Sequence, residues 1–90
     1  MITIHLGQEG RFLSGRSRAG EVVNKAWDQT ASSPVTIDFS GVESFTQSFI
    51  SELLVQLSTK GVSLGAVRFT GLSNAELLDR ANQELQRQAA

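Results

Sequence analysis

The segment Gly10–Ser17, "GRFLSGRS", has the spacing of a nucleotide phosphate loop, in which a glycine, four residues, a second glycine, a lysine and a serine cradle phosphate groups. Arg16 stands where that template has its lysine. Because a forked guanidinium is bulkier than an ammonium group, the exchange is not conservative in so tight a cradle. We therefore do not expect nucleotide hydrolysis. Arg16 and Arg18 remain candidates for weak anion binding, since a helix N-terminus beside them would favour negative charge.

The other reactive side chains do not form a recognisable catalytic set. His5 is the sole histidine, so a site with several histidine ligands is excluded, and no "GxSxG" nucleophile turn occurs. Asp38, Glu43 and Glu52 offer carboxylates, but Asp38 directly precedes a turn, where hydrogen bonds to local backbone are expected. The sequence predicts no enzyme activity, no metal site and no cofactor.

Two hydroxyls in "FTQSF", those of Thr46 and Ser48, flank Gln47 at the start of an apolar helical stripe. If Thr46 is the N-cap, then Phe45 and Ile50 have the spacing of a hydrophobic staple. Such a cap stabilises a helix by about 0.5 to 2 kcal/mol. The interpretation with the fewest assumptions is that Thr46 caps the helix and that Ser48 is simply tolerated in its first turn.

Hydropathy periods predict strands alternating with helices. Residues 2–6, 35–39 and 66–70 have the period of two typical of strands, and Phe12–Leu13 could return antiparallel as a short hairpin partner of the first. Helical spacing runs from Ser17 to about Thr30 with Trp27 on its apolar side, then from Thr46, and again from Ser73, where Glu76 completes a capping box. This order predicts an α/β fold, β(β)αβαβα, with a mixed or parallel sheet of three or four strands and helices packed on it.

Chain length and net charge further restrict the classes of protein to which this chain can belong. Ninety residues fit a single domain, 1–90, with one modest core. A net charge of -1 gives no general attraction to nucleic acid, and no apolar run approaches the roughly 20 residues of a membrane span. The absence of cysteine suits a reducing compartment, so we expect a cytoplasmic protein, either a monomer or a homodimer.

The stretch "VTIDFSGVESFTQSFISELL", residues 35–54, resembles the central signature of STAS domains, the sulfate-transporter and anti-sigma-factor-antagonist family. That signature is an apolar strand, "D-L-S-G-V", a short turn, "D-S-S-G" and a leucine-rich helix. It matches here at Asp38, Phe39, Ser40, Gly41, Val42 and Glu43, and again at Ser48, Leu53 and Leu54. A bacterial STAS-like group of unassigned function is more similar still, through Ser17 and Arg18, residues 39–44 and residues 46–49.

The resemblance implies a small regulatory module rather than an enzyme. In the best-understood branch of the family, a histidine-kinase-like ATPase that doubles as an anti-sigma factor binds the domain and phosphorylates the serine after the aspartate of "D-S-S-G", which ends the binding. Here Thr46 stands at that aspartate, Gln47 at the acceptor serine and Phe49 at the glycine. Glutamine cannot accept phosphate. Either Ser48 or Thr46 has taken the role, or the partner is bound without a phosphorylation switch.

Two hypotheses follow. In the first, the chain binds a protein partner, of the histidine-kinase-like ATPase or anti-sigma type, through a surface comprising Ser40, Gly41, Glu43, Ser44, Thr46, Gln47 and Phe49. In the second, the same helix N-terminus recognises an anion or nucleotide phosphate, assisted by Arg16 and Arg18. These arginines are expected at the opposite edge of the sheet from Thr46, unless the short strand at residues 12–13 alters the layout.

Overall fold

The computed structural model describes residues 2–26, 34–72 and 74–89. Three helices and five short strands alternate along them. The strands are β1 (Ile2–His5), β2 (Phe12–Leu13), β3 (Val35–Asp38), β4 (Ser44–Phe45) and β5 (Val67–Thr70). The helices are α1 (Arg16–Ala26), α2 (Gln47–Thr59) and α3 (Ala75–Ala89), with two short 3-10 helices, η1 (Leu6–Gln8) and η2 (Leu64–Ala66). The predicted α/β class and its order of elements are confirmed.

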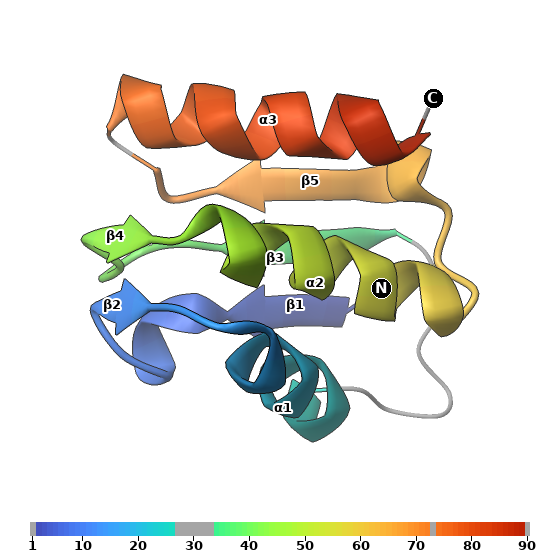
Figure 1. The fold of residues 1–90 in the computed structure, drawn as a ribbon, viewed down its shortest axis with the longest axis horizontal. Helices are drawn as coiled ribbons and strands as arrows, with labels where there is room; N and C mark the ends of the chain where they lie inside the picture. The colour runs from blue at the N-terminus through green and yellow to red at the C-terminus, as the bar shows by residue number, and fades with distance from the viewer. Residues whose placement is uncertain (1, 27–33, 73, 90) are drawn as a thin grey trace.

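The main sheet has the strand order β1-β3-β5 and is parallel throughout. Its three helices lie on one face, with α2 between α1 and α3 (Figure 1). The alternation of apolar and polar residues along each strand explains why the helices cover only one face of the sheet. Ile4, Ile37 and Phe69 stand in register on the helix side, whereas the next row, His5, Asp38 and Thr70, belongs to the polar side. A sheet with one polar face is what the period of two in the sequence predicted.

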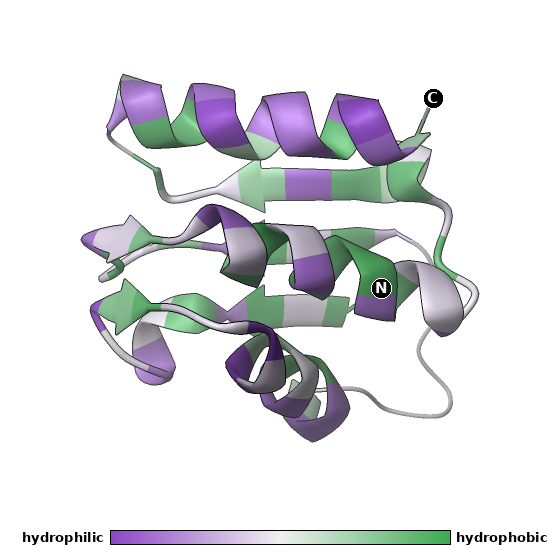
Figure 2. Cartoon of the chain, in the orientation of Figure 1, coloured by the Kyte–Doolittle hydropathy of each residue, from purple (hydrophilic) through white to green (hydrophobic). Residues whose placement is uncertain are grey.

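The core lies between that sheet and the helices, and α2 supplies much of it. Phe49, Ile50, Leu53, Leu54 and Leu57 are all fully buried. Figure 2 shows the same division on α3, where the hydrophobic turns face the sheet and the hydrophilic turns face outward. The helical stripes read from the sequence are therefore the faces that the fold buries.

The short strand β2 does not form the predicted antiparallel hairpin with β1. It pairs in parallel with β4, a strand that was expected to be a turn, and the two make a separate two-stranded sheet. Phe12 stands opposite Ser44, and Leu13 opposite Phe45. Because β2 leads into α1 and β4 into α2, this pair places the two helix N-termini side by side. The prediction that they lie at opposite edges is wrong for this reason.

One predicted helix end is not tested by the described residues, and another differs from the structure. The described part of α1 ends at Ala26, so the predicted continuation to Thr30, with Trp27, lies outside the described residues. At the start of α3, the Asn74 Oδ1 atom accepts hydrogen bonds from the N–H groups of Glu76 and Leu77, at 2.9 and 3.3 Å. Asn74 is thus the capping side chain. The predicted cap, Ser73, lies outside the described residues.

Candidate functional site

The carboxyl ends of the three parallel strands meet at one edge, and Asp38 is the central side chain there. Its Oδ1 accepts the backbone N–H of Ser40 at 3.0 Å, and its Oδ2 lies 3.1 Å from Nδ1 of His5. The Ser40 backbone hydrogen bond, followed by the Ser40 side chain and then His5, lowers the pKa of Asp38. The predicted local role of Asp38 is confirmed, while its contact with His5 was not predicted.

The His5 and Asp38 pair lies at the surface and is not part of a metal-binding cluster of the described residues. The His5 side chain is about half exposed, as expected for a surface histidine. Within residues 2–26, 34–72 and 74–89, no three histidine or acidic side chains lie close enough together to hold a metal ion. The pair therefore joins the ends of β1 and β3.

Two glycines that follow the flanking strands β1 and β5 leave room at this edge for the turn after β3. A Cβ atom on Gly7 would lie 1.8 Å from the carbonyl oxygen of Ser40, and one on Gly71 would lie 2.6 Å from the Ser40 N atom. Neither distance is sterically possible, so both positions require glycine. Ser40 and Gly41, which were predicted to face a partner, are exposed but also hold this turn between its neighbours.

The start of α2 confirms the predicted cap. The Oγ1 atom of Thr46 accepts the N–H of Phe49 at 3.2 Å, and Thr46 has the extended backbone of an N-cap. The Thr46 N–H itself donates to the carbonyl of Leu13 at 3.0 Å, which ties this cap to β2. The side chain of Phe49 is fully buried, so this predicted surface residue belongs to the core. Thr46, Gln47 and Ser48 remain exposed.

Gln47 reaches across to α3 and binds a buried carboxylate. Its Nε2 donates to Oε2 of Glu84 at 3.0 Å, and Glu84 is only 1 % exposed. Arg87 donates to the same carboxylate from Nε at 3.0 Å and from a second guanidinium nitrogen, and Gln88 donates at 2.9 Å. The hydrogen bonds from Arg87 are the main cause that lowers the pKa of Glu84 to about 2. The residue that replaces the family's acceptor serine therefore links α2 to α3.

Arg16 and Arg18 are both engaged by carboxylates. Arg16 donates to Glu52 of α2 at 3.1 Å, and Arg18 lies 3.5 Å from Glu21. Arg18 also donates to the backbone carbonyl of Glu9 at 2.6 Å. Both side chains thus bind groups of their own domain. Within the described chain, these two arginines bind Glu52, Glu21 and Glu9. In that part of the chain they do not bind the hydroxyls at the start of α2, although α1 and α2 start side by side.

Phe12 is a surface residue that the sequence motifs did not single out. It is 71 % exposed and lies opposite Ser44, immediately beside the strand that leads into α2. Glu43 is exposed on the same turn, and its N–H donates to the carbonyl of Arg11 at 2.8 Å. The sequence "RFL" could have indicated that one of these residues is exposed. Because a strand buries alternate residues, Phe12 and Leu13 cannot both enter one core.

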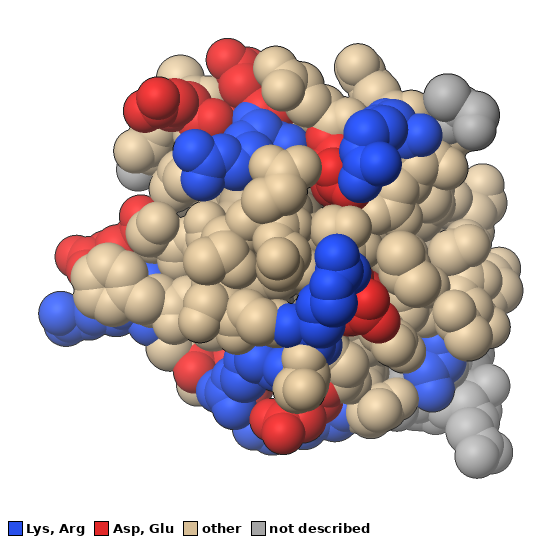
Figure 3. All heavy atoms as spheres, viewed as in Figure 1, with Lys and Arg blue, Asp and Glu red and all other residues tan. Residues whose placement is uncertain are grey.

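The exposed Arg11 and Glu43 lie beside Phe12. Figure 3 shows an area without charged side chains over the first turn of α2, with cationic and anionic groups around it. We use the name docking surface for the half-buried Ser44 together with four exposed residues, Phe12, Thr46, Gln47 and Ser48. Aromatic residues are enriched at protein interfaces relative to the rest of the surface.

The sequence was compared with models of known protein families, with curated proteins and with solved structures. Residues 20–76 match the model of the STAS-like domain of unknown function (DUF4325). The chain belongs to this STAS-like family. The match spans most of α1, the signature strand β3, all of α2 and β5, and the first residues of α3. Neither the curated proteins nor the solved structures gave a match. Among the described helices, none combines the length and the apolar character that crossing a membrane requires.

Proposed function

We propose that this STAS-like domain is a non-enzymatic signalling module that binds a protein partner through the docking surface. The exposure of Phe12 beside the start of α2 carries this proposal. A large apolar side chain with 71 % of its area in water is a ready binding anchor, because aromatic residues dominate interface energetics when a partner covers them. The family resemblance supports a histidine-kinase-like ATPase or anti-sigma factor as the partner.

Ser48 is the better of the two phosphate acceptors. The Thr46 hydroxyl already accepts the N–H of Phe49, so a phosphate on Thr46 would disturb the cap. Ser48 is exposed in the first turn of α2, where free N–H groups and the helix dipole favour negative charge. A phosphate there would bring about -1.5 to -2 charges to an uncharged docking surface. Binding would then weaken while the domain stays folded.

The alternative, anion or nucleotide-phosphate recognition assisted by Arg16 and Arg18, has less support. An incoming anion would have to displace Glu52 from Arg16 and Glu21 or Glu9 from Arg18. Since those carboxylates are covalently part of the domain, they compete at high local concentration. We therefore favour the protein-binding function.

The proposal is tested by binding to the histidine-kinase-like ATPase encoded nearest to this chain. Phe12→Ala should weaken the complex at least about tenfold in a calorimetric titration, as expected for a buried aromatic anchor. Val55→Ala is the matched control, because Val55 is the other large hydrophobic residue that is exposed in the described part of the chain, with 42 % exposure on α2. Equal affinities for the two variants would refute the docking surface.

The switch is tested separately with the same ATPase and labelled ATP. Label should enter the unmodified chain and Thr46→Val but not Ser48→Ala. Ser48→Asp should bind the ATPase more weakly than Ser48→Ala, because it places a negative charge on the docking surface. A complex that forms without any labelling would retain the binding function and reject the switch.

A further inference from the structure

β1 is an edge strand of the main sheet, and its outer side is unpaired. In a parallel ladder, residues alternate in the direction of their backbone N–H and C=O groups. The N–H of Ile2 donates to the Pro34 carbonyl at 3.3 Å, so Ile2 and Ile4 are directed toward β3. Thr3 and His5 consequently direct their N–H groups away from the sheet.

These outward groups have no internal partner. Among the described residues, neither the N–H and C=O of Thr3 nor the N–H of His5 makes a hydrogen bond. The two N–H groups are two residues apart, about 6.6 Å along the strand, which is the repeat of an extended chain. Strand edges of this kind are commonly blocked by a charge, a proline or a bulge. β1, "ITIH", has no proline and no lysine.

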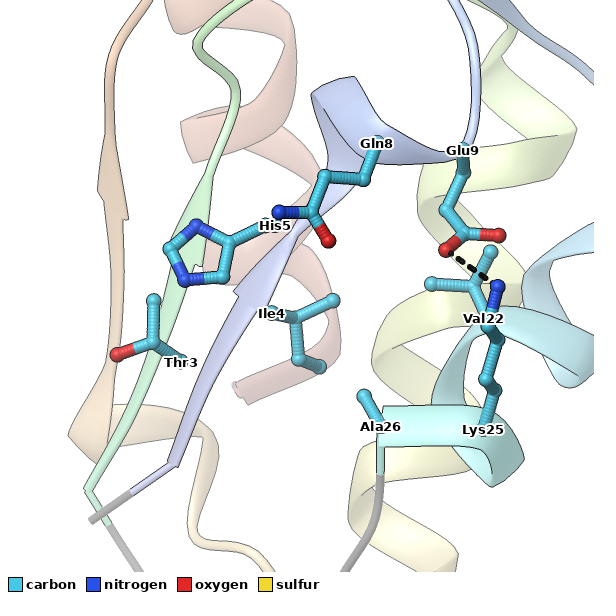
Figure 4. A pocket seen from close by; sticks show the side chains of 8 residues that line it. All are labelled: Thr3, Ile4, His5, Gln8, Glu9, Val22, Lys25 and Ala26. Atoms are coloured by element: carbon cyan, nitrogen blue, oxygen red, sulfur yellow. Dashed lines mark hydrogen bonds and ion pairs between the residues drawn. The ribbon is translucent and has the colours of Figure 1, made fainter.

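A hollow of about 190 Å³ runs along this free edge, between β1 and α1. We call it the β1–α1 groove. Figure 4 shows Ile4 and Ala26 at its apolar floor, near Val22, with His5 on one side and the pair of Lys25 and Glu9 on the other. The groove therefore offers space for one apolar side chain directly beside the unpaired backbone.

The charges around the groove are already compensated. The Lys25 Nζ atom lies 3.2 Å from Oε2 of Glu9, and the His5 ring is hydrogen-bonded to Asp38. Among the described residues that line the groove, no unpaired cation attracts a phosphate or a nucleic acid. Recognition here would depend on backbone hydrogen bonds and on an apolar side chain.

We propose that the β1–α1 groove binds an extended peptide segment of a partner protein, which adds to the sheet as a strand along β1 and inserts an aliphatic side chain over Ile4. This is β-strand addition, in which backbone hydrogen bonds supply affinity and a side-chain pocket supplies specificity. A second copy of this chain fits less well. Two β1 edges paired about a twofold axis would bring the two α1 helices together, because α1 lies beside that edge (Figure 1). The groove shares no residue with the docking surface.

The test uses a phage-displayed library of random nine-residue peptides, panned on the immobilised chain. Recovered peptides should alternate apolar residues and, as synthetic peptides, should shift the backbone amide resonances of Thr3 and His5. Thr3→Pro should weaken their binding at least tenfold, because it removes an outward N–H. Proline is tolerated in an edge strand whose N–H faces solvent, so the fold should persist. Thr3→Val keeps the N–H and is the matched control.

Ala26→Leu supplies a second, independent variant, since it fills the groove without changing β1. It should also weaken the peptides at least tenfold. The proposal is overturned if panning recovers no peptide, or if recovered peptides bind Thr3→Pro as well as Thr3→Val. Sedimentation that shows a dimer in the unmodified chain and a monomer in Thr3→Pro would overturn it in favour of a second copy.

Discussion

The first residues of α1 and α2 make the same kind of contact in very different surroundings. Arg16 begins α1 and donates to Glu52 on α2, at 3.1 Å. Gln47 begins α2 and donates to Glu84 on α3, at 3.0 Å. Each helix is thus tied at its first residue to a glutamate of the next helix. The side chain of Glu52 is 19 % exposed, whereas that of Glu84 is 1 % exposed.

This difference in exposure determines how much each contact contributes to the stability of the fold. Water solvates Arg16 and Glu52 when they separate, so their ion pair has little net effect on stability. Glu84 has no such alternative, and a buried carboxylate that loses a donor keeps its desolvation cost. The formally neutral contact of Gln47 is therefore expected to matter more than the ion pair of Arg16.

The largest effect is expected from pH, through Glu84. Its pKa is lowered to about 2 in the folded chain, against an ordinary value of 4.5. A lowered pKa means that the ionised form contributes stability above about pH 4.5, and that this stability is lost as pH falls toward 2. The full loss is roughly 3 kcal/mol. Urea unfolding from pH 7 to pH 2.5 should show this slope in the unmodified chain.

Two variants sharpen that measurement. Glu84→Gln removes the titrating group, so its unfolding free energy should fall less steeply over the same pH range. Arg87→Gln removes the main cause of the lowered pKa and should flatten the slope as well. If the slope were unchanged in both variants, it would have to come from other carboxylates.

A smaller effect is expected from Gln47→Leu. It removes one hydrogen bond to a buried charge and should lower the unfolding free energy by about 1.5 to 3 kcal/mol. Ser48→Ala, in the same helical turn, is the control and should stay within about 0.5 kcal/mol of the unmodified chain. Indistinguishable denaturation midpoints for the two variants would show that Gln47 does not link the helices.

The smallest effect is expected from Arg16→Met, which breaks the exposed ion pair. It should lower the unfolding free energy by about 0.2 to 1 kcal/mol at low salt. Salt screens such pairs, so the difference from the unmodified chain should shrink further at about 1 M sodium chloride. A loss as large as that of Gln47→Leu would mean that burial does not set the strength of these two contacts.

Local patterns in the sequence were sufficient to predict much of the fold. The cap by Thr46 depends on residues three positions apart, and the strand at Val35–Asp38 on alternation within one segment. The pairing of β2 with β4 could not be found in this way, because it joins Phe12 to Ser44 across 32 positions. A two-residue strand has too few side chains to reveal its partner.

For the turn before α2, the sequence predicted the Thr46 cap but not the contacts that the neighbouring side chains make. Thr46, Gln47 and Ser48 are exposed at the start of α2, as the comparison with STAS domains implied. The burial of Phe49 and the exposure of Phe12 were missed, since both depend on which elements pack over them.

What the sequence determined by itself was the three helices and the three strands of the main sheet, their order and their buried faces, because periodicity and capping act over a few neighbouring residues. Only the tertiary structure decided that α1 and α2 start side by side, that Glu84 is buried beneath Gln47, and that no other described strand pairs with the outer edge of β1. Each of these depends on contacts between residues far apart in the chain. Such contacts form only when the whole core closes, and no local pattern specifies them.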